Sequence, residues 1–263
     1  MRNSMTQPKL SRWRFALRLA SIHLLINILV AAVVAALVFF VWYPQPYPDL
    51  MGGLQIFGLI VAVDIICGPV LTSVLANPAK PKRETVTDLL LVGMIQAAAL
   101  LYGLYTVTAV RPVWVVFEND RFTTVSAAEI DKNRLNEALP EFRQLPWTGV
   151  KRIAVRDSKS GDEEQARIEM SMQGIEPRML PAWWEAENET HRDRIRSKMR
   201  PVAELEKRYP GHPALAQAIS KSGLPSADLY YLPFTSQENK DWTVLLDKNT
   251  DFKAFAPLDA FKK

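Results

Sequence analysis

Asp64 lies in the middle of an apolar stretch, and of all the residues in this sequence it is the one whose position most strongly indicates a chemical role. An acid at the centre of a bilayer span costs about 2.5 to 3.5 kcal/mol to insert, so it should face protein or water and not lipid. Its chemistry would then be to tie helices together, to receive a polar group of another protein's transmembrane helix, or to carry protons or ions. All three roles need polar partners at a similar depth.

Two amide side chains are predicted to lie near the depth of Asp64. At about 1.5 Å per residue from the charged ends of the spans, Asp64 lies roughly 18 Å deep, Gln96 roughly 12 Å and Asn27 roughly 10 Å. His23 lies only roughly 5 Å deep, so we expect it to be out of reach. A protonated or hydrogen-bonded Asp64 that joins the helices through Gln96 or Asn27 is the structural interpretation.

Gly68 and Pro69 follow Asp64 by one helical turn, and a kink is expected at this pair. The functional interpretation is that Asp64, beside the kink, receives a polar group of a partner's helix. A proton or ion path is a third interpretation. The candidate contacts to a partner helix are Asp64, Gln96, Asn27, Gly68 and Pro69.

Recognisable catalytic and metal-binding patterns are missing from the sequence. An intramembrane aspartyl protease needs a second acid at similar depth, whereas Asp88 lies at the cytoplasmic border. The histidines are scattered without cysteine partners, which argues against zinc. GxSxG and Walker motifs are also missing. We therefore predict a protein that is not an enzyme, with no catalytic residue, metal or cofactor.

The elements that must position Asp64 are three long apolar segments. A bilayer core of about 30 Å needs about 20 apolar residues, and the segments 20–43, 54–76 and 88–110 meet this length. They predict a three-helix transmembrane domain over residues 20–110, after a basic N-terminus over residues 1–19.

Charge predicts the orientation of these spans. Residues 1–110 hold eight Lys or Arg and four Asp or Glu, and the rest of the chain holds 24 of each. The cations flank the apolar segments, including Arg2 before the first and Lys80 between the second and third, whereas the hairpin from Pro44 to Gly53 has none. Because Lys and Arg in short loops stay in the cytoplasm, the N-terminus is predicted inside and residues 111–263 outside. Cations in these places orient spans and do not indicate nucleic acid.

Residues 111–263 are long enough for one domain. Apolar runs bounded by turn residues predict strands, and Ser126 with Glu129 has capping-box spacing that predicts a helix ending at Pro140. We expect an α+β domain with a small antiparallel sheet. In the pair Trp183-Trp184, one ring can enter the core while the other faces a membrane or partner, although core packing is the more common explanation for large aromatics. Residues 191–200 are typical of a solvated helix face. The other predicted elements are strands over 113–117, 122–125, 150–155, 229–232, 242–246 and 252–255, and helices over 161–173 and 213–222.

Several short motifs over residues 20 to 131 occur together in a known family. They are Phe39-Phe40-Val41-Trp42-Tyr43-Pro44, Val63-Asp64, Gly68-Pro69, Asn77-Pro78, Lys80-Pro81, Gln96, Tyr102-Gly103-Leu104-Tyr105, Arg111-Pro112-Val113 and Val116-Phe117-Glu118. With them the chain resembles the TfpX/TfpZ-type type IV pilin accessory proteins of Gram-negative bacteria. Looser matches follow at 231–233 and 241–247.

The resemblance implies a chaperone-like helper in the bacterial inner membrane, with its C-terminal domain in the periplasm. Its partners would be the lipid bilayer and a type IV pilin, held through both the pilin's transmembrane helix and its periplasmic head. An alternative is a membrane-anchored periplasmic sensor or ligand-binding protein, although about 19 N-terminal residues and a loop at 77–87 leave no room for an output domain. An enzyme acting on pilin or lipid is a third hypothesis.

Overall fold

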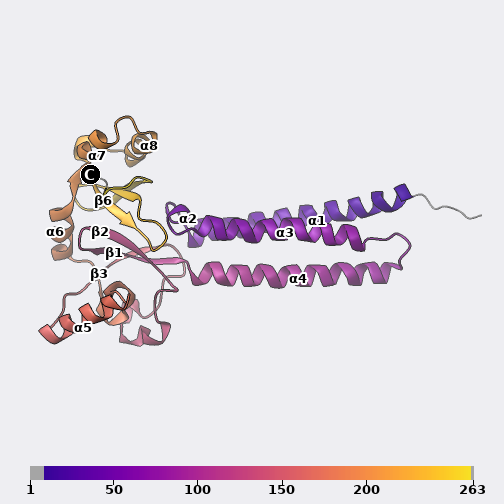
Figure 1. Ribbon diagram of the computed structural model, residues 1–263, viewed down its shortest axis with the longest axis horizontal. Helices are drawn as coiled ribbons and strands as arrows, with labels where there is room; N and C mark the ends of the chain where they lie inside the picture. Colours follow the sequence, from indigo (N-terminus) through magenta and orange to yellow (C-terminus); the bar gives the residue numbers. More distant parts are fainter. Residues whose placement is uncertain (1–8, 262–263) are drawn as a thin grey trace, which may run out of the picture. The chain divides into compact units, whose positions relative to one another are not determined.

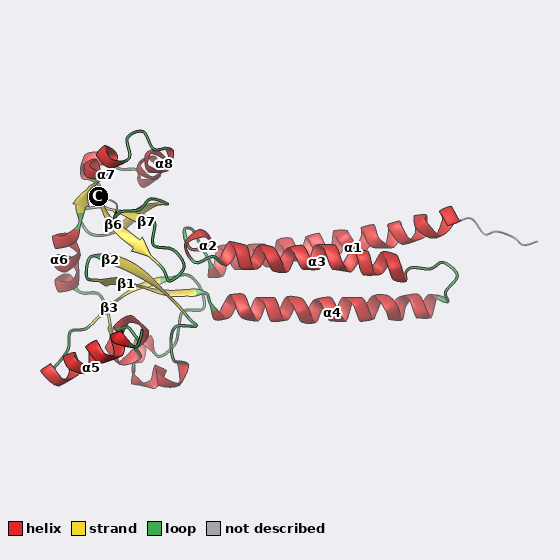
Figure 2. Ribbon diagram, in the orientation of Figure 1, coloured by secondary structure: helices red, strands yellow, loops and turns green. Residues whose placement is uncertain are grey.

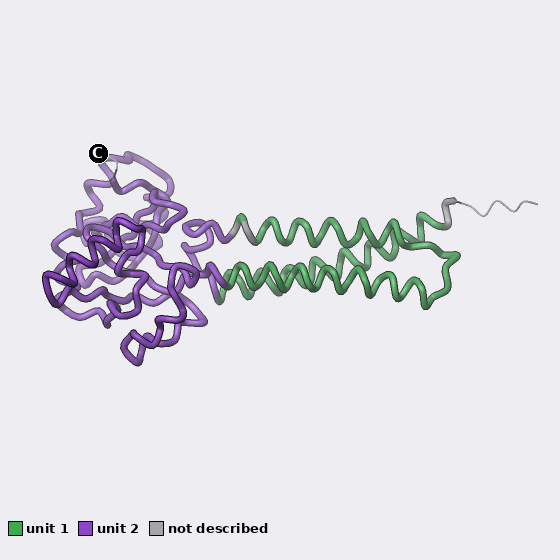
Figure 3. Tube along the Cα trace, turned by 60° about the horizontal axis from the view of Figure 1, so that its bottom comes forward, with its two compact units in different colours: residues 1–41, 54–108 green, residues 42–53, 109–263 purple. Residues whose placement is uncertain are grey.

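The computed structural model describes residues 9–261, and these form two compact units (Figure 3). Unit 1 takes the described residues up to 41 together with 54–108, and unit 2 takes 42–53 together with those from 109 onward. Part of the predicted N-terminal segment 1–19, including Arg2, lies outside the described residues.

Unit 1 consists of long helices (Figure 1). Most of their apolar side chains are exposed. The stretches Arg12–Trp42, Phe57–Leu75 and Lys82–Ala109 are long and apolar enough to cross a membrane, yet only 11 to 17 % of each apolar window is buried. Such helices need an apolar solvent, and the prediction of three transmembrane helices is confirmed. The helices are α1 (Lys9–Leu37), which continues as a π-helical turn over Val38–Trp42, α3 (Gly53–Leu75) and α4 (Lys82–Ala109).

Contacts along α3 set the register of its two neighbours. Phe39 of the π-helical turn meets Phe57 edge to face, with 5.1 Å between ring centroids. Farther along, a Cβ on Gly103 of α4 would lie 2.8 Å from Ile60 Cδ1. The missing side chain at Gly103 therefore lets α4 approach α3 closely, as small residues do between membrane helices.

Unit 2 is built on a mixed sheet of eight strands (Figure 2). The strand order is β4-β3-β1-β2-β6-β7-β8, with β5 paired to β6. Strand β1 is buried at five successive positions, Pro112 to Val116, so both of its faces are covered. The strands are β1 (Pro112–Glu118), β2 (Arg121–Ser126), β3 (Lys151–Val155), β4 (Trp184–Glu185), β5 (Arg200–Pro201), β6 (Tyr230–Thr235), β7 (Trp242–Leu246) and β8 (Phe252–Ala256).

The expected α+β class is confirmed, but the sheet is neither small nor purely antiparallel. The hairpin β1–β2 and the meander β6–β7–β8 are antiparallel, as local turn signals predict. They join through the parallel pair β2–β6, and β3 also pairs with β1 in parallel. Parallel neighbouring strands lie far apart in sequence, so no turn pattern in the sequence predicts their pairing.

Two apolar clusters stabilise the two halves of this sheet. One contains Trp114 and Trp184, whose ring centroids are 5.6 Å apart, with Ile153 beside them. The other joins the meander to short helices through residues such as Leu215 and Leu245. The helices of unit 2 are α2 (Tyr47–Leu50), α5 (Gly161–Met172), α6 (Glu189–Lys198), α7 (Val202–Arg208) and α8 (Pro213–Ser222), with 3₁₀ turns at Lys132–Glu137, Pro140–Phe142, Pro177–Met179, Pro181–Trp183 and Ser226–Asp228.

The helix predicted to start at Ser126 is wrong. Glu129 does accept a hydrogen bond from the backbone N–H of Ser126 at 2.7 Å, but Ser126 is the last residue of β2. Only a short 3₁₀ turn forms, capped by the side chain of Asp131. The capping contact here closes a turn after a strand, because the apolar periodicity that follows is too weak to hold an α-helix.

Trp183 and Trp184 are both buried, so the pair follows the commoner pattern of core packing, and the alternative in which one ring faces out is wrong. Trp184 enters the core and donates its Nε1–H to the carbonyl of Arg178 at 2.9 Å. Trp183 is covered instead by the guanidinium of Arg156, whose Cζ lies 4.5 Å from the ring centroid. The side chain of a long cation thus buries the outer ring.

The hairpin between the first two apolar helices belongs to unit 2. Tyr47 of α2 contacts Phe234 of β6, with ring centroids 6.1 Å apart, and Ser236 donates its hydroxyl to the carbonyl of Leu50 at 2.7 Å. Because residues 42–53 and the segment from 109 onward form one packed unit, they lie on the same side of any membrane that the helices cross.

Candidate functional site

The polar residues of the three spans meet at Asp64, and the meeting point is its backbone carbonyl as well as its carboxylate. Asn27 Nδ2 donates to the Asp64 carbonyl at 3.0 Å. Gln96 Nε2 donates to the same carbonyl at 2.9 Å and to Asp64 Oδ1 at 3.1 Å. The prediction that both amides reach Asp64 is therefore confirmed, and the three helices are joined at one residue.

His23 lies apart from this cluster, as the depth estimate predicts. Its Nδ1 is 2.6 Å from the hydroxyl of Thr72, which is fully buried. The imidazole therefore bonds α1 to α3 near the predicted cytoplasmic end, independently of Asp64.

Gly68 leaves room for the Gln96 amide. A Cβ on Gly68 would lie 2.3 Å from Gln96 Nε2 and 2.7 Å from its Oε1, so the amide packs directly over the glycine. Pro69 lies inside α3 and lacks the N–H of an ordinary helical residue. Helix α3 is assigned without interruption through this pair, and the kink stays a prediction.

The Asp64 cluster is open on one side. Asp64 is half-buried, and in the part of the chain that the structure describes, only its Oδ1 has a side-chain hydrogen bond. Val63 and Cys67, four residues apart and therefore neighbours on the helix surface, flank Asp64 and are both exposed. An external donor would find a free carboxylate oxygen there beside small side chains.

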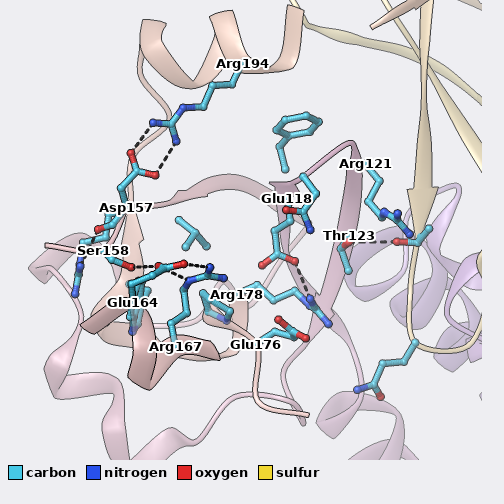
Figure 4. A pocket seen from close by; sticks show the side chains of 18 of the residues that line it. Glu118, Arg121, Thr123, Asp157, Ser158, Glu164, Arg167, Glu176, Arg178 and Arg194 are labelled. Carbon is cyan, nitrogen blue, oxygen red and sulfur yellow. Dashed lines mark hydrogen bonds and ion pairs between the residues drawn. The ribbon is translucent and has the colours of Figure 1, made fainter. Parts of the chain in front are cut away.

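A second candidate site is a polar pocket of unit 2, with a volume of about 1030 Å³ (Figure 4). Its walls come from the β1–β2 turn, the segment after β3, helix α5, the 176–178 turn, α6 and the segment after β6. Six cations and four acids line it, an excess of two positive charges. They are Arg121, Arg156, Arg167, Arg178, Arg194 and Lys240, with Glu118, Asp157, Glu164 and Glu176.

Ion pairs fix most of the arginines in this wall. Arg194 is bonded through two nitrogens to Asp157, and Arg167 is bonded in the same way to Glu164. These pairs face the cavity in Figure 4. Residues 191–200 thus lie largely on α6 with acid partners, in agreement with the prediction of a solvated helix face.

Glu118 and Arg178 form the least exposed ion pair of the pocket, with Oε2 and Nη1 2.7 Å apart. Burial raises the pKa of the Glu118 carboxyl, although the neighbouring Arg178 lowers it. Arg178 Nε is buried and, among the described residues, has no acceptor.

The sequence gives no sign of this pocket, because its residues come from segments up to 123 positions apart and follow no motif. The walls can bind a polar, charged segment by charge-assisted hydrogen bonds.

Each histidine outside the spans has a structural partner: His191 caps α6 and lies 2.9 Å from Glu185, and His212 caps α8. Over residues 9–261, no three His, Cys, Asp or Glu side chains gather as metal ligands would.

The stability of unit 2 should fall in acid through the first turn of α5. Arg156 holds the pKa of Glu163 at about 2 and Arg167 holds that of Glu164 at about 2, both below the ordinary 4.5. A depressed carboxyl pKa stabilises the fold above pH 4.5, and this contribution is lost as the pH falls toward 2. In the E163Q/E164Q variant, denaturation midpoints should therefore depend less on pH between 4.5 and 2 than in the wild type. Equal pH dependence in both proteins would contradict this.

Comparison with known proteins places the chain among proteins of fimbrial assembly. Residues 11–52 match the family model "Fimbrial assembly protein FimB". The chain is 38% identical over 253 residues to the "Fimbrial assembly protein, serogroup I" of Dichelobacter nodosus, covering 95% of this chain and 98% of the relative. It is 36% identical to the serogroup E1 protein of that organism, with the same coverage. No solved structure matches.

Proposed function

Since the chain belongs to the fimbrial assembly protein family, we propose that it assists assembly of a type IV pilus by binding its cognate pilin in the inner membrane. The family relationship supports the role in fimbrial assembly, and the narrower TfpX/TfpZ type is part of the proposal. The mechanism is binding alone, in the manner of a chaperone, without a catalytic step.

The observation that carries the proposal is that Asp64 Oδ2 has no hydrogen bond among the described residues, whereas Oδ1 accepts one from Gln96. A pilin awaiting assembly is anchored by a single transmembrane helix, and a polar group on that helix needs a partner in the bilayer. Oδ2 of Asp64 is available to it, while Asn27 and Gln96 hold the Asp64 residue in place. Val63 and Cys67 allow close approach of another helix.

The polar pocket of unit 2 is the proposed second contact, with the pilin's head. Its charged walls suit a charged surface segment. We place unit 2 in the periplasm, where the head is, on the charge asymmetry of the loops. The grouping of hairpin 42–53 with residues from 109 onward supports this topology, because it requires both on one side.

Site-specific photo-crosslinking in living cells tests the proposal. A crosslinker at Cys67 should capture the pilin, whereas one at Ile66 should capture much less. Both side chains are exposed, but Cys67 lies about 60° around the α3 axis from Asp64, and Ile66 lies about 160° from it. D64N, which keeps the size of the side chain, should lower capture at position 67. If Cys67 and Ile66 give equal yields, or if neither gives any, the proposed helix contact is wrong.

A ligand-binding sensor is the second candidate, and the pocket is the observation that favours it. The two functions differ in what the pocket holds. Crosslinkers at Asn119 and Lys240, which line the pocket, should capture the pilin head if the pocket serves assembly. A sensor would instead leave these positions uncrosslinked to pilin while pilus assembly still required Arg178.

A further inference from the structure

Trp147 is a large aromatic side chain that unit 2 leaves in contact with solvent. Its exposed fraction is 60%, although tryptophan is usually well covered in a folded domain. It lies in the segment between the 3₁₀ turn Pro140–Phe142 and strand β3. The other tryptophans that unit 2 contains are buried: Trp42, Trp114, Trp183, Trp184 and Trp242.

Contacts within unit 2 fasten Trp147 to both chain positions where apolar spans end. Its ring meets that of Trp42 edge to face, with centroids 5.7 Å apart, and Trp42 is the last residue of the first candidate span. The guanidinium carbon of Arg111 lies 5.2 Å from the Trp147 ring centroid. Arg111 follows the end of the third span by two residues, and its Nη2 donates to the carbonyl of Pro146 at 3.2 Å.

The end of an apolar span marks the depth at which the hydrocarbon core gives way to headgroups. Tryptophan prefers this interface, since its ring is apolar while its indole N–H seeks a polar acceptor. Trp42 and Arg111 are themselves buried, so they hold the Trp147 ring in place, and of the three residues Trp147 alone presents its surface outward. A residue held against Trp42 and Arg111 therefore lies at that depth as well.

We infer that Trp147, with Trp42 and Arg111, forms an interfacial anchor whose exposed ring face contacts phospholipid of the leaflet next to unit 2. The segment 143–147 thus rests on the membrane, although it lies more than thirty residues beyond the last span. The inference rests on the helices crossing the bilayer, as in the proposed function, but needs no pilin.

Spin labelling of the full chain tests the anchor. The protein carries Cys67→Ser and is placed in vesicles of phosphatidylcholine and phosphatidylglycerol, with a nitroxide at Trp147→Cys. Controls are Met172→Cys, on α5 and 85% exposed, and Leu29→Cys, in the middle of the first span and 67% exposed. Collision with lipid-soluble oxygen is compared with collision with a water-soluble nickel chelate.

The ratio of oxygen to nickel accessibility at position 147 should be several-fold higher than at 172 and below that at 29. A ratio at 147 equal to that at 172 overturns the anchor, as does a label shielded from both reagents, which would indicate a protein contact. If the label at 29 also reads as aqueous, the membrane premise itself has failed, a result distinct from failure of the anchor.

A second measurement leaves the native residue in place. Tryptophan fluorescence of the wild-type chain is measured in vesicles whose acyl chains carry bromine close to the headgroup, and is compared with that of W147L. The fraction of emission that bromine quenches should be smaller in W147L. An unchanged quenched fraction would show that Trp147 does not meet lipid and would overturn the inference.

Discussion

Replacing Gly68 by alanine should destabilise unit 1 by about 1 to 3 kcal/mol, although the change adds a single methyl group. The new Cβ would lie 2.3 Å from Gln96 Nε2, so the amide must move away. Moving it breaks the hydrogen bonds from Gln96 to the Asp64 carbonyl and to Oδ1. The folded fraction of the full chain in bicelles, measured against added denaturing detergent, reports the loss.

Gly58 offers a matched control on the same helix, because a Cβ there meets nothing within 4 Å. Gly58→Ala should leave the stability unchanged or raise it slightly, since alanine favours helix. A double-mutant cycle adds a sharper criterion: in a Gln96→Ala background, Gly68→Ala should have almost no effect. An undiminished effect in that background would mean that Gln96 is not the residue displaced.

Replacing Arg152 by alanine should cost unit 2 about 3 kcal/mol. The guanidinium of Arg152 lies over the rings of Phe122 and Phe252, with its Cζ 5.0 and 4.6 Å from their centroids. It also bonds Glu187 at 2.7 Å and the carbonyl of Thr250 at 2.5 Å. One side chain of β3 thereby connects β2, β8 and the segment before α6. Among the described residues, truncation would leave the mostly buried Glu187 with the weaker partner Arg192 at 3.3 Å.

Denaturation of the full chain in detergent micelles, followed by near-ultraviolet circular dichroism, measures this cost. Arg152→Lys should lie between the wild type and Arg152→Ala, because lysine keeps the charge but not the planar fork. Arg134→Ala, which removes an exposed arginine paired only with neighbouring Glu137, should leave the transition nearly unchanged. Similar losses in Arg134→Ala and Arg152→Ala would show that the location of Arg152 is unimportant.

The spans and the Asp64 cluster could be predicted because lipid makes the rules simple. A span needs about 20 apolar residues at a fixed rise, so depth can be counted along the chain and Asn27 and Gln96 placed beside Asp64. The depth of a residue does not determine how its helix is rotated about its own axis, and this rotation decides which atoms meet. The Asp64 carbonyl as a shared acceptor, and the Gln96 amide lying on Gly68, became visible only in the structure.

In unit 2, local patterns found the strands but not their partners. The runs at 150–155, 242–246 and 252–255 each form a strand close to the predicted bounds. The helix predicted over 213–222 also forms, with the predicted bounds. The parallel pairs β1–β3 and β2–β6 depend on contacts distant in sequence, as does the pocket beside them. The burial of Trp183 also depends on a distant residue, since the arginine that covers it lies 27 residues earlier in the chain.

The inclusion of hairpin 42–53 in unit 2 has a consequence for biogenesis. The chain segment that supplies Tyr47 and Leu50 leaves the ribosome almost 190 residues before Ser236, which bonds to it. Unit 2 therefore cannot complete its fold until its last strands have been synthesised, and the early loop must wait for them. A fragment that starts after the third span would lack this loop, so complementation by two separately expressed halves should require the hairpin in one of them.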